Sequence, residues 1–193
     1  MDAYSVVLTL HLLALLLAAM ASSVALYAAL QLRQATGPPE AARWGRLVAS
    51  VVPAFPVATA TLLGSGAYMT ESRWTWGTSW IDAGLTGLGL IVLCGSGIEA
   101  NRGRLLKREL TSVGMSARAR RLLRDPYAWS AKMTTLTLMV GIVFVMTAKP
   151  DALASAATIA ASVVVGVISA IPFWRDSTVT TTLRRGHTKP ARA

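Results

Sequence analysis

Residues that build catalytic and redox sites are scarce in this chain. Among its 193 residues there is one cysteine, Cys94, and there are two histidines, His11 and His187. A lone cysteine excludes an intrachain disulfide. The sequence also has no glycine-rich phosphate loop and no serine–histidine–acid or zinc-protease signature. We therefore expect a protein that is not an enzyme.

Charged residues are scarce as well. They make up 15% of the chain, against 53% hydrophobic residues, and the mean hydropathy is +0.50. Uncharged intervals of about 20 residues recur, which is the length of helix that crosses a bilayer. Lipid cannot hydrogen-bond a bare backbone, so such intervals cross as helices. The sequence predicts an all-α, multi-pass membrane protein whose bundle of five transmembrane helices occupies residues 1–176, with spans at 4–31, 47–69, 80–98, 127–147 and 152–173.

Acidic residues number 9 against 19 basic residues, which gives a formal net charge of +10. The basic residues gather in alternate loops. The first loop has three, the third has eight and the C-terminal tail has five, whereas the second has only Arg73 and the fourth only Lys149. Because the basic loops of membrane proteins lie in the cytoplasm, this alternation predicts an outside N-terminus and an inside C-terminus.

The same rule accounts for the positive charge, so we expect no nucleic-acid partner. Instead, the basic cytoplasmic loop at 99–126 and a disordered basic tail at 177–193 should face anionic lipids of the cytoplasmic leaflet. Within the loop, the segments RGRLLKREL and SARARRLLRDP can lie on that leaflet as short amphipathic helices. The chain begins Met-Asp-Ala, without the basic residues that precede the apolar core of a signal peptide, so we expect the first span to be retained. Arginine outnumbers lysine 15 to 4 and alanine is abundant, which fits a bacterial inner-membrane protein.

Small residues mark the expected helix contacts. Helices in lipid associate through close approach at small side chains rather than through hydrophobic burial. The packing positions that we expect are Gly84, Gly87 and Gly95 in the third span, and Ser162 and Gly166 in the fifth. Pro53 and Pro56 predict a kink in the second span. Asp125 before Pro126 predicts a capped helix start, and Asp151 can cap the fifth helix.

His11 interrupts the first apolar run, VLTLHLLALLLAAMASSVAL. It shares a helix face with the small residues Ala14, Ala18, Ser22, Ala25 and Ala29. That face should point into the bundle, about 10 Å below the outer surface at a rise of about 1.5 Å per residue. Asp82 is the acidic residue that enters the membrane from the same side, and intramembrane ionisable groups are usually paired or functional. We therefore predict a pair of His11 with Asp82.

The predicted pair belongs to an outward-facing polar pocket beneath the segment RWTWGTSW. The other ligand- or proton-binding candidates at this level are Tyr68, Arg73, Trp76 and Trp80. A purely structural hydrogen bond between two helices is the alternative role for the pair. Met139 and Met146 share a face of the fourth helix and, with His11, are weak candidates for a copper site. Methionine in a membrane helix more often serves packing.

Two segments carry a resemblance to a known group. The segments LHLLALLLAAMASSVALY and LLGSGAYMTESRWTWGTSWIDAGL resemble small bacterial integral membrane proteins related to the copper-resistance D-like group. The matching positions are His11, Gly64, Gly66 and Trp80. The resemblance implies a helical membrane protein in which His11, the early histidine, has a role in handling copper or haem.

Three functions are open at this point. The first is a binding or transport module without a cofactor, as a homo-oligomer or with a membrane partner subunit. The second is a membrane redox protein that handles haem or copper. The third is a structural accessory subunit of a larger membrane complex. A visible absorption spectrum and metal analysis of the purified protein would distinguish the second from the others.

Overall fold

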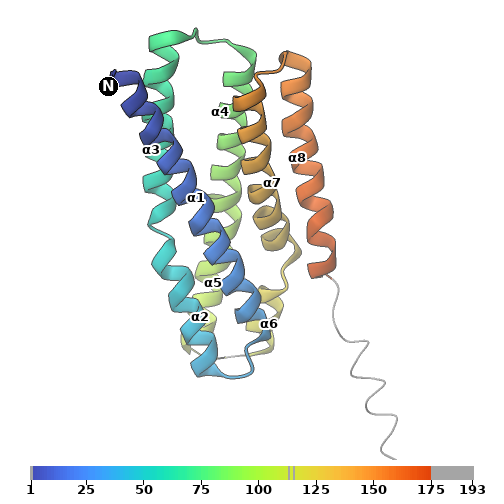
Figure 1. Ribbon diagram of the computed structural model, residues 1–193. Coiled ribbons are helices and arrows are strands. Elements are labelled where there is room, and N and C mark those ends of the chain that lie inside the picture. Colours follow the sequence, from blue (N-terminus) through green and yellow to red (C-terminus); the bar gives the residue numbers. More distant parts are fainter. Residues whose placement is uncertain (1, 113, 115, 175–193) are drawn as a thin grey trace, which may run out of the picture.

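The computed structural model describes residues 2–112, 114 and 116–174, and they form helices without a strand in this part of the chain. The predicted tail at 177–193, with His187, lies outside the described residues. The helices are α1 (Ala3–Gln34), α2 (Pro38–Val51), α3 (Ala54–Arg73), α4 (Ser79–Val92), the π-helix η1 (Leu93–Glu99), α5 (Ala100–Ser112), α6 (Ala117–Leu123), α7 (Pro126–Ala148) and α8 (Ala152–Trp174) (Figure 1).

Five helical segments of the described chain are long and apolar enough to cross a membrane. They are Ala3–Gln34, Pro38–Arg73, Ser79–Ser112, Ala117–Ala148 and Ala152–Trp174. The predicted all-α bundle with five candidate membrane helices is thereby confirmed.

The predicted loop at 99–126 is largely helical. α5 continues directly from η1, and α6 follows a short turn around Gly114, which has a φ of +82° (Figure 1). The sequence predicts the end of the third span at residue 98, where the apolar run ends. Leucine, arginine, lysine and glutamate are good helix formers, so the helix continues past the apolar segment until a glycine stops it.

Proline interrupts a helix and aspartate caps helix starts at the positions that the sequence predicts. Between α2 and α3, Pro53 has no N–H to offer, and the Phe55 N–H bonds the Val52 carbonyl oxygen at 3.2 Å in a tightened turn. The Asp125 carboxylate accepts hydrogen bonds from the backbone N–H groups of Tyr127 (2.9 Å) and Ala128 (3.1 Å). Asp151 accepts one from the Ala154 N–H at 2.8 Å.

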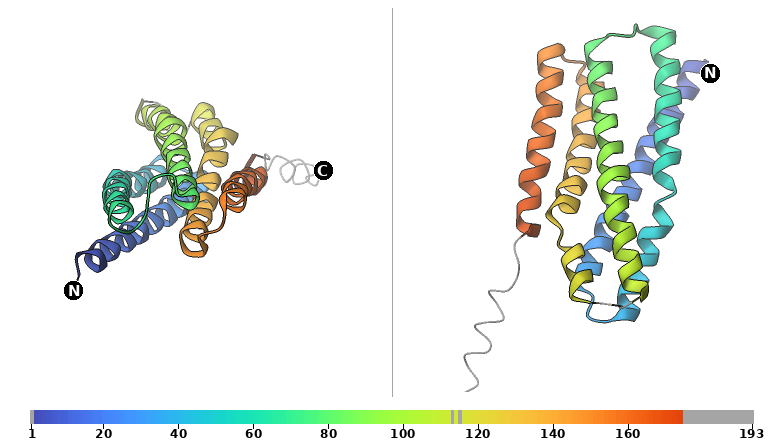
Figure 2. Two further views of the ribbon diagram at one scale, coloured as in Figure 1. Left: turned by 90° about the horizontal axis from the view of Figure 1, so that it is seen from above. Right: turned by 180° about the vertical axis from the view of Figure 1, so that it is seen from behind.

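The described helices form two groups. α1 packs along α2 and α3, while α4 and η1 pack on α7, which also packs on α8. The groups meet where α1 contacts α6 and α7 and where α2 contacts α5. α3 and α4 are joined by a short loop but stand apart from each other in Figures 1 and 2. The groups are therefore held together mainly at the end opposite the N-terminus.

Glycines bring α4, α7 and α8 close together. A Cβ on Gly87 would lie 2.8 Å from Ile142 Cγ1, and one on Gly84 would overlap the Met146 methyl group. Gly166 lies directly against the backbone of Thr134, and nearby the Thr137 hydroxyl donates to the Ser162 carbonyl oxygen at 2.7 Å. Gly95 differs from the prediction, since nothing lies within 4 Å of its Cβ position. It falls in η1, whose wider turn of more than four residues shifts it off the packed face of α4.

Candidate functional site

His11 lies in the third turn of α1 and faces α3. Its Nδ1 is 2.9 Å from the Ser65 hydroxyl, and the Ser65 hydroxyl donates to the Thr61 carbonyl oxygen at 2.5 Å. A serine hydroxyl has one proton to donate, so Ser65 accepts the bond from His11 Nδ1–H. In the neutral imidazole the lone pair is then on Nε2. The Leu62 backbone is also within hydrogen-bonding reach of the His11 ring.

The small residues of α3 make room for the ring. Gly66 follows Ser65, and a Cβ at Gly66 would be 3.7 Å from His11 Cε1. On α1, Ala14, Ser22 and Ala25 are buried and Ala18 and Ala29 are half-buried, so the predicted small-residue face does point into the bundle.

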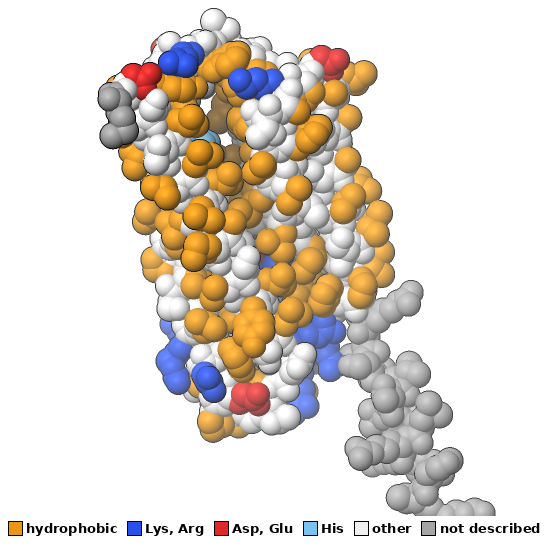
Figure 3. Space-filling model, viewed as in Figure 1, with side chains coloured by type: hydrophobic (Ala, Val, Ile, Leu, Met, Phe, Trp, Pro, Cys, Tyr) orange, Lys and Arg blue, Asp and Glu red, His pale blue; other side chains and the backbone are white. Residues whose placement is uncertain are grey.

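A hollow opens between the two groups of helices near the N-terminal end of the bundle. Figure 3 shows it beneath a rim that carries both acidic and basic side chains, with the pale blue of histidine inside it. His11 is the histidine of the described residues, and it is half-buried. The imidazole therefore lines a recess in the apolar part of the surface rather than facing outward among the leucines.

The structure does not bring His11 and Asp82 together. His11 bonds Ser65, and no hydrogen bond or ion pair joins it to Asp82, an exposed residue in the first turn of α4. α1 packs on α2 and α3, whereas α4 packs on α7 and α8. The predicted pairing was wrong because depth in the membrane placed both residues at one level without fixing which helices are neighbours.

Arg73 joins α3 to the start of α1 at the rim. Its guanidinium is 3.5 Å from the Asp2 carboxylate, and its Cζ lies 3.9 Å from the ring centre of Tyr4. Asp2 also accepts the Ser5 N–H at 3.0 Å, and the hydrogen bonding of Ser5 together with the charge of Arg73 lowers the pKa of that carboxyl. Arg73 is thus engaged within its own helix group.

Two tryptophans of the segment RWTWGTSW, Trp74 and Trp80, pack against each other. Trp74 and Trp80 pack edge to face with ring centres 4.9 Å apart, and Lys149 Nζ lies 4.3 Å from the centre of the Trp74 ring. Trp76 instead donates to Glu71 at 2.5 Å, and both Trp76 and Tyr68 are exposed. The predicted candidates therefore do not form one contact network with His11.

The two methionines contact different helices. Met139 Sδ accepts a hydrogen bond from the Ser22 hydroxyl of α1 at 3.7 Å. The Met146 methyl group fills the space beside Gly84 of α4. Both side chains contribute to helix packing, and their sulfurs do not converge on His11.

An ion pair inside the bundle was not predicted from the sequence. Lys132 of α7 bonds Glu99, the last residue of η1, and the two side chains are 20% and 24% exposed. One turn further along, Arg102 of α5 pairs with Asp125 at 3.4 Å. The signal was present, because Lys132 is a cation within the predicted span at 127–147, and intramembrane charges are usually paired. Glu99 falls one residue past the predicted end of the third span.

Compared with protein-family models, curated proteins and solved structures, the chain matches none of them. The resemblance to the copper-resistance D-like group stays a prediction.

Proposed function

We propose that this chain is a small non-catalytic membrane protein that binds or transports a small ligand through an outward-facing crevice, with His11 as the binding group. The N-terminal end of the bundle is the outer end in this proposal, following the alternation of basic loops. The site lies in a multi-pass protein of the bacterial inner membrane.

The observation that carries the proposal is the imidazole at the hollow. Ser65 fixes the ring by accepting a hydrogen bond from Nδ1–H, at 2.9 Å. Nε2 is left with a lone pair that can accept a proton, accept a hydrogen bond or bind a cation. A polar group held in a recess among apolar side chains is the usual composition of a small-ligand site. A histidine needed only to join two helices would not require a recess beside it.

Cysteine accessibility tests the crevice. In a Cys94→Ala background, we expect His11→Cys to react with an impermeant, charged thiosulfonate added from the outside, because a water-filled crevice lets the thiol ionise. Leu12→Cys is the matched control, since Leu12 lies at the same depth and its side chain is 54% exposed on the apolar surface. We expect it to react more slowly by about tenfold or more, since lipid excludes the reagent and suppresses the thiolate. Equal rates at the two positions, with both variants folded, would refute an aqueous crevice at His11.

The orientation is tested with the same background. We expect cysteines at Thr78 and Ala148 to be labelled from outside intact cells, and one at Ser116 to be labelled only after the membrane is opened. Thr78 precedes α4 and Ala148 ends α7 at the N-terminal end of the bundle, while Ser116 begins α6 at the opposite end. Labelling of Ser116 in intact cells would reverse the orientation and make the crevice face the cytoplasm.

A further inference from the structure

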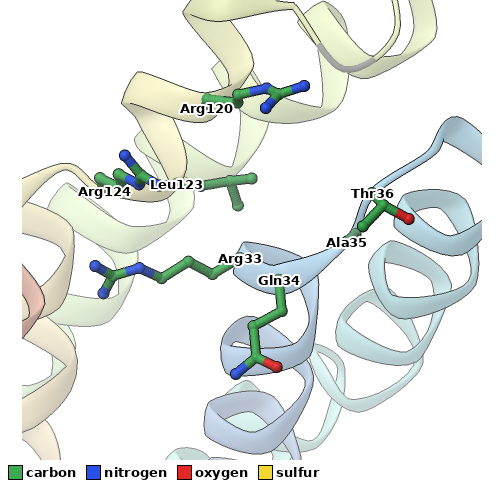
Figure 4. A pocket seen from close by; sticks show the side chains of 7 residues that line it. All are labelled: Arg33, Gln34, Ala35, Thr36, Arg120, Leu123 and Arg124. Carbon is green, nitrogen blue, oxygen red and sulfur yellow. The ribbon is translucent and has the colours of Figure 1, made fainter. Parts of the chain in front are cut away.

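Arginines from two helices line a cavity at the end of the bundle opposite His11. The cavity has a volume of about 300 Å³ and lies between the end of α1, with Arg33, and α6, with Arg120 and Arg124. Figure 4 shows the guanidinium groups of Arg33 and Arg124 extending toward the same side, with Leu123 between the two helices and Arg120 reaching away from them. A second hollow shares Arg120 and Arg124 and is also lined by Trp174 at the end of α8.

Arg33 is held in place by aromatic rings. Trp129 and Phe173 stack with ring centres 4.5 Å apart, and the Arg33 Cζ lies 5.6 Å and 5.8 Å from those centres. The Trp129 indole N–H in turn donates to the Leu123 carbonyl oxygen at 2.8 Å, which ties α7 to the end of α6. A guanidinium that is already oriented loses less freedom when it binds an anion, and its fork matches the oxygens of a phosphate group.

The cavity lies at the level of the lipid headgroups in the bilayer. Arg33 follows Tyr4 by 29 residues of helix. At about 1.5 Å per residue that is about 44 Å, close to the full thickness of a bilayer with its headgroups. Trp174, an interfacial residue type, marks the same level on α8, and Ile168 and Ile171 above it are exposed. An acyl chain can therefore lie along α8 while its headgroup reaches the arginines.

We propose that this cavity binds the phosphate of an anionic phospholipid headgroup from the cytoplasmic leaflet, with Arg33 and Arg124 as the principal ligands and Arg120 at the mouth. Basic pockets between membrane helices on the cytoplasmic side recognise such headgroups. Because the site joins α1 to α6, α7 and α8, bound lipid holds the two helix groups together where they meet.

Native mass spectrometry of the detergent-solubilised chain tests the proposal, because a micelle of neutral detergent has no charged surface to attract lipid unspecifically. The probes are phosphatidylglycerol, phosphatidylcholine and inorganic phosphate. We expect phosphatidylglycerol to bind in preference to phosphatidylcholine, and inorganic phosphate alone to bind far more weakly. In Arg33→Gln/Arg124→Gln the affinity for phosphatidylglycerol should fall by about fivefold for each guanidinium removed.

Two further variants control for misfolding and for the loss of one positive charge. Arg120→Gln changes an exposed side chain, so it should fold normally and still weaken binding. Arg104→Gln removes the same charge from an exposed position on α5, away from the cavity, and should leave binding unchanged. Equal losses in Arg104→Gln and Arg120→Gln, or equal binding of the two lipids, would refute the site. Inorganic phosphate binding as tightly as phosphatidylglycerol would support a phosphate pocket but overturn lipid as its ligand.

Discussion

Glu99→Gln is expected to destabilise the protein by about 3 kcal/mol, because it leaves the Lys132 ammonium inside the bundle without its carboxylate. The substitution keeps the size of the side chain, so lost packing does not explain the effect. Lys132→Met should cost a similar amount, since it leaves the Glu99 carboxylate unpaired at the same place. Reversible unfolding in mixed micelles measures both changes in the free energy of unfolding.

The double variant of Glu99 and Lys132 tests whether the single variants are unstable because each leaves one charge unpaired. Buried ion pairs replaced as a whole by uncharged side chains often lose little stability, so Glu99→Gln/Lys132→Met should recover most of the loss. The control pair is Arg118 and Glu109, which are 4.0 Å apart with the Arg118 side chain 68% exposed. Arg118→Gln should cost at most about 1 kcal/mol. If the double variant is as unstable as the sum of the two single variants, then the charges are not coupled and this interpretation fails.

The membrane helices could be predicted because bilayer thickness sets their minimum length. Each predicted span falls within a helical segment of the structure, and the breaks at Pro53 and at Asp125 before Pro126 follow from backbone chemistry. α5 and α6 lie in the segments RGRLLKREL and SARARRLLRDP, which the sequence allows as short amphipathic helices. The start of α2 was not predicted, because it precedes the span at 47–69 and bilayer thickness sets no maximum length for a helix. A helix continues into water as long as its residues favour helix and no glycine or proline ends it.

The site could be predicted only for one helix at a time. The period of about 3.6 residues placed His11 on the small-residue face of α1, and the structure agrees. The same period says nothing of which helix lies opposite. Ser65 was a possible partner because it lies between two glycines, where helices can approach closely, but an acidic residue was the stronger electrostatic partner for a histidine. The pairing of α1 with α3 decided between them, and helix pairing depends on the whole bundle.

The Lys132–Glu99 pair was missed for a related reason. Hydropathy is averaged over a window of residues, so a single lysine in the apolar segment 127–147 does not change the prediction of a membrane span there. A single charged residue in a membrane helix is nevertheless informative, because such residues are usually paired or functional. Glu99 was assigned to a loop because the third span was ended at residue 98, although the helical structure continues into η1 and α5.

Gly166→Ala is expected to destabilise the bundle by about 2 kcal/mol, because overpacking of a tight contact costs about 1–3 kcal/mol. The added methyl group would meet the backbone of Thr134, with the Thr134 nitrogen 2.8 Å away and the Thr137 hydroxyl 2.6 Å away. Backbone atoms cannot rotate aside, so α8 must move from α7, which also weakens the bond from Thr137 to Ser162. Thermal unfolding in detergent measures the effect.

Two other glycines of the bundle calibrate this prediction. At Gly141 a Cβ would meet the Ser162 hydroxyl, a side-chain atom that can rotate away, so Gly141→Ala should cost less than Gly166→Ala. At Gly89 nothing lies within 4 Å, and Gly89→Ala should gain up to about 1 kcal/mol from the better helix propensity of alanine. The expected order of melting temperatures is therefore Gly89→Ala above Gly141→Ala above Gly166→Ala. If Gly166→Ala melts as high as Gly89→Ala, then α7 and α8 are not in the close contact that the structure gives them.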